Sequence, residues 1–177
     1  ERHLGEAWTL DDMLPHVHHL ERGLIRVDAD EVTYPLHVIL RFELEQDIVA
    51  GRLEAADIPE AWDAGMRAYL GLSTIDNPAD GPMQDVHWPG GAFGYFPSYT
   101  LGAMMAAQQW AALVKDHPAA DADLAAGDLT AINGWRREKI WSQGSRWSTP
   151  ELIERATGEK LEAGHFIRHL KQRYGRS

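Results

Sequence analysis

The sequence has 177 residues, of which 44% are hydrophobic and 25% charged, a composition typical of a globular protein with one core. Its net charge of −10 argues against a nucleic-acid partner, and no apolar run approaches the roughly eighteen residues that a membrane span needs. The chain contains no cysteine, which excludes disulfides, thiolate zinc sites and cysteine nucleophiles and is typical of a cytoplasmic protein. We therefore expect a single domain, residues 1–177, in the cytoplasm.

The first predicted helix covers residues 10–21. The stretch from Thr9 to Asp12 resembles a capping box in which Asp replaces the usual Glu, and Gly23 is expected to end the helix. Pro15 is expected to bend this helix or to shift its start, because proline lacks the backbone N–H.

A long buried helix is predicted over residues 29–50. The stretch Asp28-Ala29-Asp30 offers candidates for its N-cap, and Gly51 is a natural stop. Its apolar residues recur at helical spacing at Val32, Leu36, Leu40, Leu44 and Ile48. The β-branched residues and Pro35 leave a strand over 32–42 as the alternative.

The remaining chain is predicted to be helical apart from one long ordered loop over residues 73–99. Ile58-Pro59 marks a helix that runs to about Gly71. Thr100 is expected to cap the helix after the loop, and Thr149 to cap another with Pro150 in its first turn. The predicted C-terminal helices cover 101–116, 121–126, 128–142, 149–156 and 162–174. The fold class is therefore all-α, with Trp135, Trp141 and Trp147 expected in the core.

The loop contains the most unusual stretch of the chain, GPMQDVHWPGGAFGYFPSYTLG (81–102), which is rich in glycine, proline and aromatic residues. In extended backbone, Asp85 and His87 point to the same face, so the carboxylate can fix the tautomer of the imidazole. Such an imidazole can stabilise an oxyanion or transfer a proton. The alternative is a structural loop in which the histidine only fills space and forms hydrogen bonds.

Arg26 lies between two apolar residues in LIRVDAD (24–30), which suggests a partly buried guanidinium. Such a side chain can bind a substrate carboxylate through two parallel hydrogen bonds. The alternative is an internal salt bridge to Asp28 or Asp30.

The remaining histidines give no convincing metal site. His16, His18 and His19 do not all share one helical face, and His165 and His169 lack the intervening Glu of a zinc-binding HExxH motif. We expect both groups to form solvated helix faces. No metal ligands are therefore predicted in this chain.

Two motifs in order give the chain a family resemblance. IRVDAD (25–30) matches I-R-x-x-A-D, and GPMQDVHW (81–88) matches G-x-x-Q-D-x-H-W at every fixed position. With their flanking segments, 30–45 and 91–108, they resemble the Taq-type, or thermostable, metallocarboxypeptidase family. The resemblance covers essentially the whole chain. Pro35 and Trp141 depart from it, because the family tends to have Asn and His there.

The resemblance implies a C-terminal part of a larger, mainly helical, zincin-like zinc carboxypeptidase that acts on peptides. In the family an HExxH helix and a downstream Glu hold the zinc, and both precede the I-R-x-x-A-D motif. This chain has no HExxH, so the zinc ligands of the complete enzyme would lie outside it and the chain alone would be inactive. It would pack against the missing N-terminal part or self-associate, and homodimers are usual in the family.

Alternatives are an inactive truncated homologue that binds peptides or assembles with a partner, and an unrelated helical interaction protein.

The resemblance also implies roles for individual residues. The loop would line one wall of the substrate cleft, opposite the zinc, with His87 near the scissile carbonyl and oriented by Asp85. A hydroxyl group would come from Tyr95 or Tyr99. Arg26 would bind the C-terminal carboxylate of the peptide. Two further residues of the second motif, Gln84 and Trp88, would take part in substrate binding.

Overall fold

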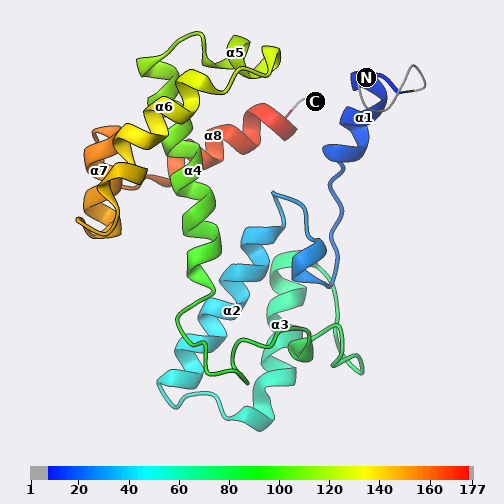
Figure 1. Ribbon diagram of the computed structural model, residues 1–177. Helices are drawn as coiled ribbons and strands as arrows, with labels where there is room; N and C mark the ends of the chain where they lie inside the picture. The colour runs from blue at the N-terminus through cyan, green and yellow to red at the C-terminus, as the bar shows by residue number, and fades with distance from the viewer. Residues whose placement is uncertain (1–7, 176–177) are drawn as a thin grey trace. The chain divides into compact units, whose positions relative to one another are not determined.

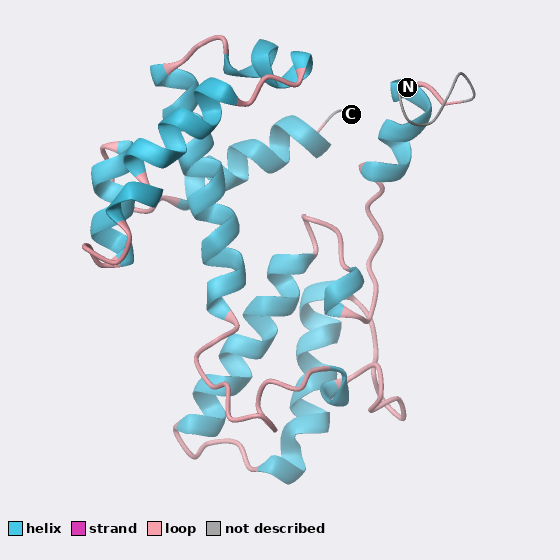
Figure 2. Cartoon of the chain, in the orientation of Figure 1, coloured by secondary structure: helices cyan, strands magenta, loops and turns pink. Residues whose placement is uncertain are grey.

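The computed structural model describes residues 8–175, and within this range the protein contains helices and loops but no strand (Figures 1 and 2). The all-α prediction is therefore confirmed. The α-helices of the described range are α1 (Leu10–Val17), α2 (Tyr34–Val49), α3 (Ile58–Leu70), α4 (Pro97–Asp116), α5 (Ala120–Ala126), α6 (Thr130–Lys139), α7 (Thr149–Thr157) and α8 (Ala163–Tyr174). None of them combines the length and apolar character that crossing a bilayer requires.

The chain forms two compact units that divide between Thr100 and Leu101. The first unit contains α1 to α3 and the long loop, and the second contains most of α4 and all of α5 to α8. The single domain over residues 1–177 stays a prediction.

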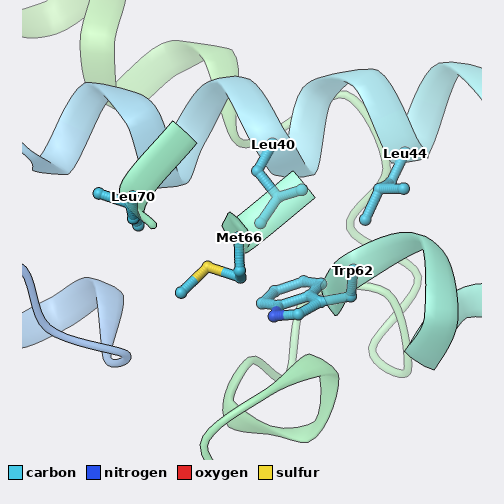
Figure 3. Packing of buried hydrophobic residues seen from close by; sticks show 5 residues of the cluster. All are labelled: Leu40, Leu44, Trp62, Met66 and Leu70. Atoms are coloured by element: carbon cyan, nitrogen blue, oxygen red, sulfur yellow. The ribbon is translucent and has the colours of Figure 1, made fainter. Parts of the chain in front are cut away.

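The core of the first unit lies between α2 and α3. Figure 3 shows Leu40 and Leu44 of α2 next to the side chains of α3, where Trp62, Met66 and Leu70 are buried. Gly65 permits this close approach, because a Cβ at that position would collide with Leu40. The helix ends where the chain enters a left-handed conformation at Gly71 (φ 69°), as the sequence predicts.

Helix α2 begins five residues later than predicted. The Asp30 carboxylate accepts hydrogen bonds from the N–H groups of Val32 and Thr33 and so stabilises a turn before the helix. Pro35 then occupies the first turn, where a missing N–H costs no helical hydrogen bond. The alternative strand over 32–42 is wrong.

The predicted first helix forms but is shorter than expected. The Asp12 carboxylate accepts a hydrogen bond from the N–H of Thr9, and the Thr9 hydroxyl oxygen accepts one from the N–H of Asp12. The predicted capping box is therefore present. The helix ends at Val17, well before Gly23, and Pro15 lies inside it. No residue of α1 is buried, so no packing favours a longer helix.

The long loop between α3 and α4 is present as predicted and contains one short 3₁₀ helix, Pro82–Gln84. Helix α4 begins at Pro97 rather than after Thr100. Proline at a first helical position explains the earlier start, because its fixed φ suits the first turn.

The second unit packs around Leu113, Ala120, Ile132, Trp135 and Ala156. Its buried polar centre is Gln108, whose side-chain N–H groups donate to the hydroxyl of Thr157 and to the carbonyls of Glu159 and Lys160. The carbonyl of the same side chain accepts from the N–H of Glu162. Gln108 thus ties α4 to the segment between α7 and α8.

Two predictions for the second unit, one N-cap and one core tryptophan, are wrong. The N-cap of α7 is Ser148, not Thr149, because the Glu151 carboxylate accepts from the N–H and hydroxyl of Ser148. Trp135 is buried as expected, Trp147 is only half-buried, and Trp141 is 50% exposed.

The face that carries His165 and His169 is not freely solvated either. Both histidines are half-buried, His165 lies 2.6 Å from a carboxylate oxygen of Glu159, and His169 stacks on Phe166.

Candidate functional site

Two buried arginines share one carboxylate in the first unit. One oxygen of Asp85 accepts hydrogen bonds from Nη2 (2.8 Å) and Nε (3.2 Å) of Arg26. The other oxygen accepts from Nε of Arg41. Arg26 is 5% exposed and Arg41 is not exposed at all. We call these three residues the Arg–Asp–Arg cluster.

Local structure brings the three side chains together. Arg26 begins a 3₁₀ helix, Arg26–Asp28, and Arg41 lies on the buried side of α2. Asp85 follows the loop's 3₁₀ helix in extended backbone. Aromatic rings cover both guanidinium groups: Arg41 lies 4.4 Å from the centre of the Trp62 ring, and Arg26 lies 4.9 Å from that of Tyr99.

Charge and burial act in opposite directions in the cluster. Burial by itself raises the pKa of Asp85, but the hydrogen bonds and charges of Arg26 and Arg41 outweigh it, so the pKa lies below its usual value. Burial lowers the pKa of Arg41 to about 10, although Asp85 opposes the shift. All three groups are therefore charged at neutral pH, and the cluster carries two positive charges for one negative charge.

His87 lies beside this cluster. Its Nε2 is 3.0 Å from the hydroxyl of Tyr99, within hydrogen-bonding distance. Its Nδ1 is 3.6 Å from Asp85, which is too long for a hydrogen bond but close enough for an electrostatic interaction. The imidazole packs against Phe96, with ring centres 4.4 Å apart, and lies 5.6 Å from the ring of Tyr95. The catalytic residues predicted from the sequence therefore lie together, while their roles stay predictions.

The predicted substrate-binding residue Gln84 is tied to backbone groups. Its carbonyl oxygen accepts from the N–H of Arg26, and its amide nitrogen donates to the carbonyl oxygens of Leu24, Asp80 and Gly81. These bonds join the loop to the segment that carries Arg26.

Trp88 is anchored in a similar way. Its indole N–H donates to a carboxylate oxygen of Glu45 at 2.8 Å, and its ring packs edge-to-face on Trp62. Both side chains thus position the site, and direct contact of Gln84 and Trp88 with a substrate stays a prediction.

The partner of Arg26 differs from the alternative raised by the sequence. Arg26 pairs with Asp85, 59 residues away in the chain, rather than with Asp28 or Asp30. Asp30 instead accepts hydrogen bonds from backbone N–H groups, which include that of Glu21.

Sequence reasoning missed several polar residues around the site. Arg41 lies between Leu40 and Phe42, the same apolar setting that drew attention to Arg26, so this signal was present. Glu45 accepts from the indole of Trp88 and from the N–H of Gly94, which fixes the loop at two points. Buried acids and arginines on a predicted core helix are therefore worth attention in such a sequence.

Two further residues of α2 adjoin the cluster. The hydroxyl of Tyr34 accepts from Nη1 of Arg26 at 2.6 Å. His37 is fully buried, and burial together with the charge of Arg41 lowers its pKa from 6.5 to about 4. His37 is therefore neutral at pH 7.

The described residues do not fit a catalytic metal. Between Trp8 and Gly175, no three His, Cys, Asp or Glu side chains come together as a metal site. Asp85 lies 3.6 Å from His87, and both of its oxygens accept from guanidinium groups. A catalytic zinc site needs three protein ligands.

Comparison with known proteins identifies the family of the chain. The model of the family described as carboxypeptidase Taq (M32) metallopeptidase matches residues 2–174. Thermostable carboxypeptidase 1 of Thermus thermophilus is 43% identical over 171 residues, which are 97% of this chain and 33% of that protein. Carboxypeptidase 1 of Bacillus subtilis is 42% identical over 166 residues, 94% of this chain and 33% of the relative.

Solved structures agree with the sequence relatives. Metallocarboxypeptidase 1 of Trypanosoma cruzi superimposes with a TM-score of 0.92 at 46% identity, over 97% of this chain and 36% of that chain. A carboxypeptidase of Pyrococcus furiosus gives 0.91 at 36% identity, over 94% and 33%. Fold and sequence are thus those of a metallopeptidase. More narrowly, the chain belongs to the carboxypeptidase Taq (M32) family, and it spans about a third of the length of these relatives.

Proposed function

We propose that this chain supplies substrate-binding and catalytic residues to a zinc-dependent carboxypeptidase that releases C-terminal amino acids from peptides. One observation carries the proposal. Residues of two motifs about sixty positions apart, Arg26 in one and Asp85 and His87 in the other, meet beside Arg41, which gives the site an excess positive charge. A carboxypeptidase must bind the negative C-terminus of its substrate, and such a cluster suits that task.

Each residue has a distinct role in the proposal. Arg26 binds the C-terminal carboxylate of the peptide, and His87 donates a hydrogen bond to the oxyanion that develops at the scissile carbonyl. Asp85 orients the imidazole of His87 through the 3.6 Å contact between its carboxylate and Nδ1, so that Nε2 is the nitrogen that meets the substrate. Tyr99 bonds to Nε2 of His87 before the substrate arrives, and the half-exposed Tyr95 contributes a second hydroxyl.

In the proposal the zinc ligands belong to the part of the enzyme outside this chain, where zinc supplies Lewis-acid chemistry. The residues of this chain act on the peptide alone, so the chain by itself is inactive. Exposed apolar side chains on α2, among them Phe42 and Val49, support a surface that another polypeptide covers. That polypeptide is either the remaining part of the enzyme or a second copy of the chain, and in the second case we expect a homodimer. We place the protein in the cytoplasm.

A second candidate function is an inactive homologue that binds peptides or assembles with a partner. It is favoured by the combination of an intact Arg–Asp–Arg cluster with the lack of a metal ligand set among the described residues. Sequencing of the gene upstream of Glu1 separates the two candidates. An encoded HExxH segment favours the enzyme, and a nearby start codon without such a segment favours the homologue.

Kinetics on the complete, metal-loaded enzyme test the proposed function. Arg26→Ala should lower kcat/KM on a peptide by roughly 30- to 1000-fold, since a charge-assisted pair contributes about 2–4 kcal/mol. Lysine at this position should rescue poorly, because it lacks the planar fork. His87→Ala should lower mainly kcat, because the oxyanion exists only near the transition state.

The C-terminally amidated peptide is the matched control substrate. The wild-type enzyme should prefer the free carboxylate strongly, and Arg26→Ala should lose most of that preference. If Arg26→Ala keeps the preference, or if His87→Ala changes KM alone, these roles are wrong.

A further inference from the structure

The hydrogen bonds of Arg26 pose a problem for carboxylate binding. Its Nε and Nη2 already bind Asp85, and its Nη1 donates to Tyr34. A guanidinium has five N–H groups, so two remain for a ligand. An arginine paired one-to-one with an aspartate has no net charge, however, and would attract a substrate carboxylate only weakly.

We propose that Arg41 is a positioning residue for substrate recognition: it shares Asp85 with Arg26 and thereby leaves the cluster one net positive charge for the C-terminal carboxylate of a peptide. This inference rests on the proposed carboxypeptidase function and adds a residue to it.

Burial restricts Arg41 to an indirect role. Its side chain is 0% exposed, so a substrate would meet it only through its neighbours. Nε holds one oxygen of Asp85, Nη1 donates to the carbonyl of His37 one helical turn earlier, and the guanidinium lies over Trp62. These contacts fix the second positive charge to the rigid α2–α3 core.

The charge balance of the surroundings supports the inference. His37, the titratable group next to Arg41 on α2, is neutral at pH 7. Glu45, a buried acid on α2, accepts hydrogen bonds from the N–H groups of Trp88 and Gly94 rather than from an arginine. Asp85 is therefore the acid that forms ion pairs with Arg26 and Arg41, and it balances only one of their charges.

Removal of the positive charge of Arg41 gives the first test.

The variant Arg41→Met in the complete, metal-loaded enzyme keeps an unbranched side chain and leaves a neutral Arg26–Asp85 pair. We expect the preference for a free C-terminal carboxylate over an amide, measured as the ratio of kcat/KM values, to fall about tenfold through KM. Arg41→Lys should retain most of the preference. A purely structural role would instead lower activity on both substrates alike, and that outcome would overturn the proposal.

A double variant checks the charge balance directly. Adding Asp85→Asn to Arg41→Met leaves Arg26 as a lone cation, so the net charge returns to +1 and the preference for the carboxylate should recover. The single variant Asp85→Asn carries +2 and should prefer the carboxylate at least as strongly as the wild type. Should Arg41→Met fail to fold, Arg41→Gln removes the same charge while keeping a polar side chain, and an unchanged preference in that variant refutes the inference.

The failure of this inference is distinguishable from failure of the proposed function. If Arg26→Ala abolishes the preference and Arg41→Met does not change it, Arg26 binds the carboxylate without help from Arg41. If Arg26→Ala leaves the preference intact, the assigned function of the whole cluster is wrong.

Discussion

Each of the two units contains a buried polar centre, and the two centres differ in kind. In the first unit Arg26, Asp85 and Arg41 bring three charges together with an imbalance of one. In the second unit the neutral side chain of Gln108, 0% exposed, makes four hydrogen bonds, three of them to backbone groups. Both centres join segments that lie more than forty residues apart in the chain.

The difference indicates what each centre is for. A neutral amide with its hydrogen bonds satisfied stabilises a fold without the desolvation cost of a charge. Buried charges rarely stabilise a protein more than apolar residues of similar volume would. An unbalanced charged cluster beside His87 is therefore better explained by function than by stability, and its excess charge favours an anionic ligand.

The largest effect is expected when the shared carboxylate is removed. Asp85→Ala leaves two buried guanidinium groups without their counter-charge and should lower the free energy of unfolding by about 3–5 kcal/mol. Denaturant titration measures this loss of unfolding free energy. The control Asp47→Ala removes an exposed pair with Arg52 and should cost less than about 1 kcal/mol. Similar losses in both variants would mean that the cluster is no more demanding than a surface pair.

The neutral centre should be less sensitive. Gln108→Ala removes four hydrogen bonds and leaves buried backbone groups without partners, which should cost about 2–3 kcal/mol. The half-buried neighbour on the same helix, Gln109, is the control, and its replacement by alanine should change the free energy of unfolding by less than about 0.5 kcal/mol. A larger loss for Gln108→Ala than for Asp85→Ala would reverse the comparison.

A pH dependence should arise in the first unit at His37. The pKa of this residue is about 4 in the folded protein and 6.5 by reference, so the unfolded chain takes up a proton first as the pH falls. Stability should therefore decrease from pH 6.5 to pH 4, by roughly 2–3 kcal/mol for a shift of this size.

Unfolding curves of the wild type and of His37→Gln at several pH values isolate this contribution. The variant should lack it, and parallel pH profiles for the two proteins would contradict the assignment.

The smallest effect is expected at an exposed tryptophan of the second unit. Trp141→Ala should change the free energy of unfolding by only about 0.5 kcal/mol, because the ring is half exposed and forms a cation–π pair with Arg136 at the surface. The buried Trp135, whose indole N–H donates to Asp116, is the contrasting position, and its replacement by alanine should cost about 3 kcal/mol or more. Equal losses would show that Trp141 belongs to the core after all.

Several local features follow from the sequence alone, because the interactions that fix them span only a few residues. The capping box at Thr9 and the glycine stop after α3 are present as predicted. Pro35 lies in the first turn of α2 and Pro97 begins α4, which explains why the predicted starts at 29 and 101 are wrong. Proline tolerates the first turn of a helix better than its interior, so these residues are better guides than the polar residues nearby.

The sequence by itself determined the helical fold class, the long loop, the family and the residues of both motifs. Only the tertiary structure decided that Arg26 pairs with Asp85, that Arg41 shares this carboxylate, and that Glu45 holds the loop at Trp88. The physical reason is range: helix caps and turns depend on neighbours in the chain, whereas a buried charge is balanced by whatever side chain the fold brings within about 3 Å. Residues 41 and 85 are 44 positions apart, and no local pattern specifies that distance.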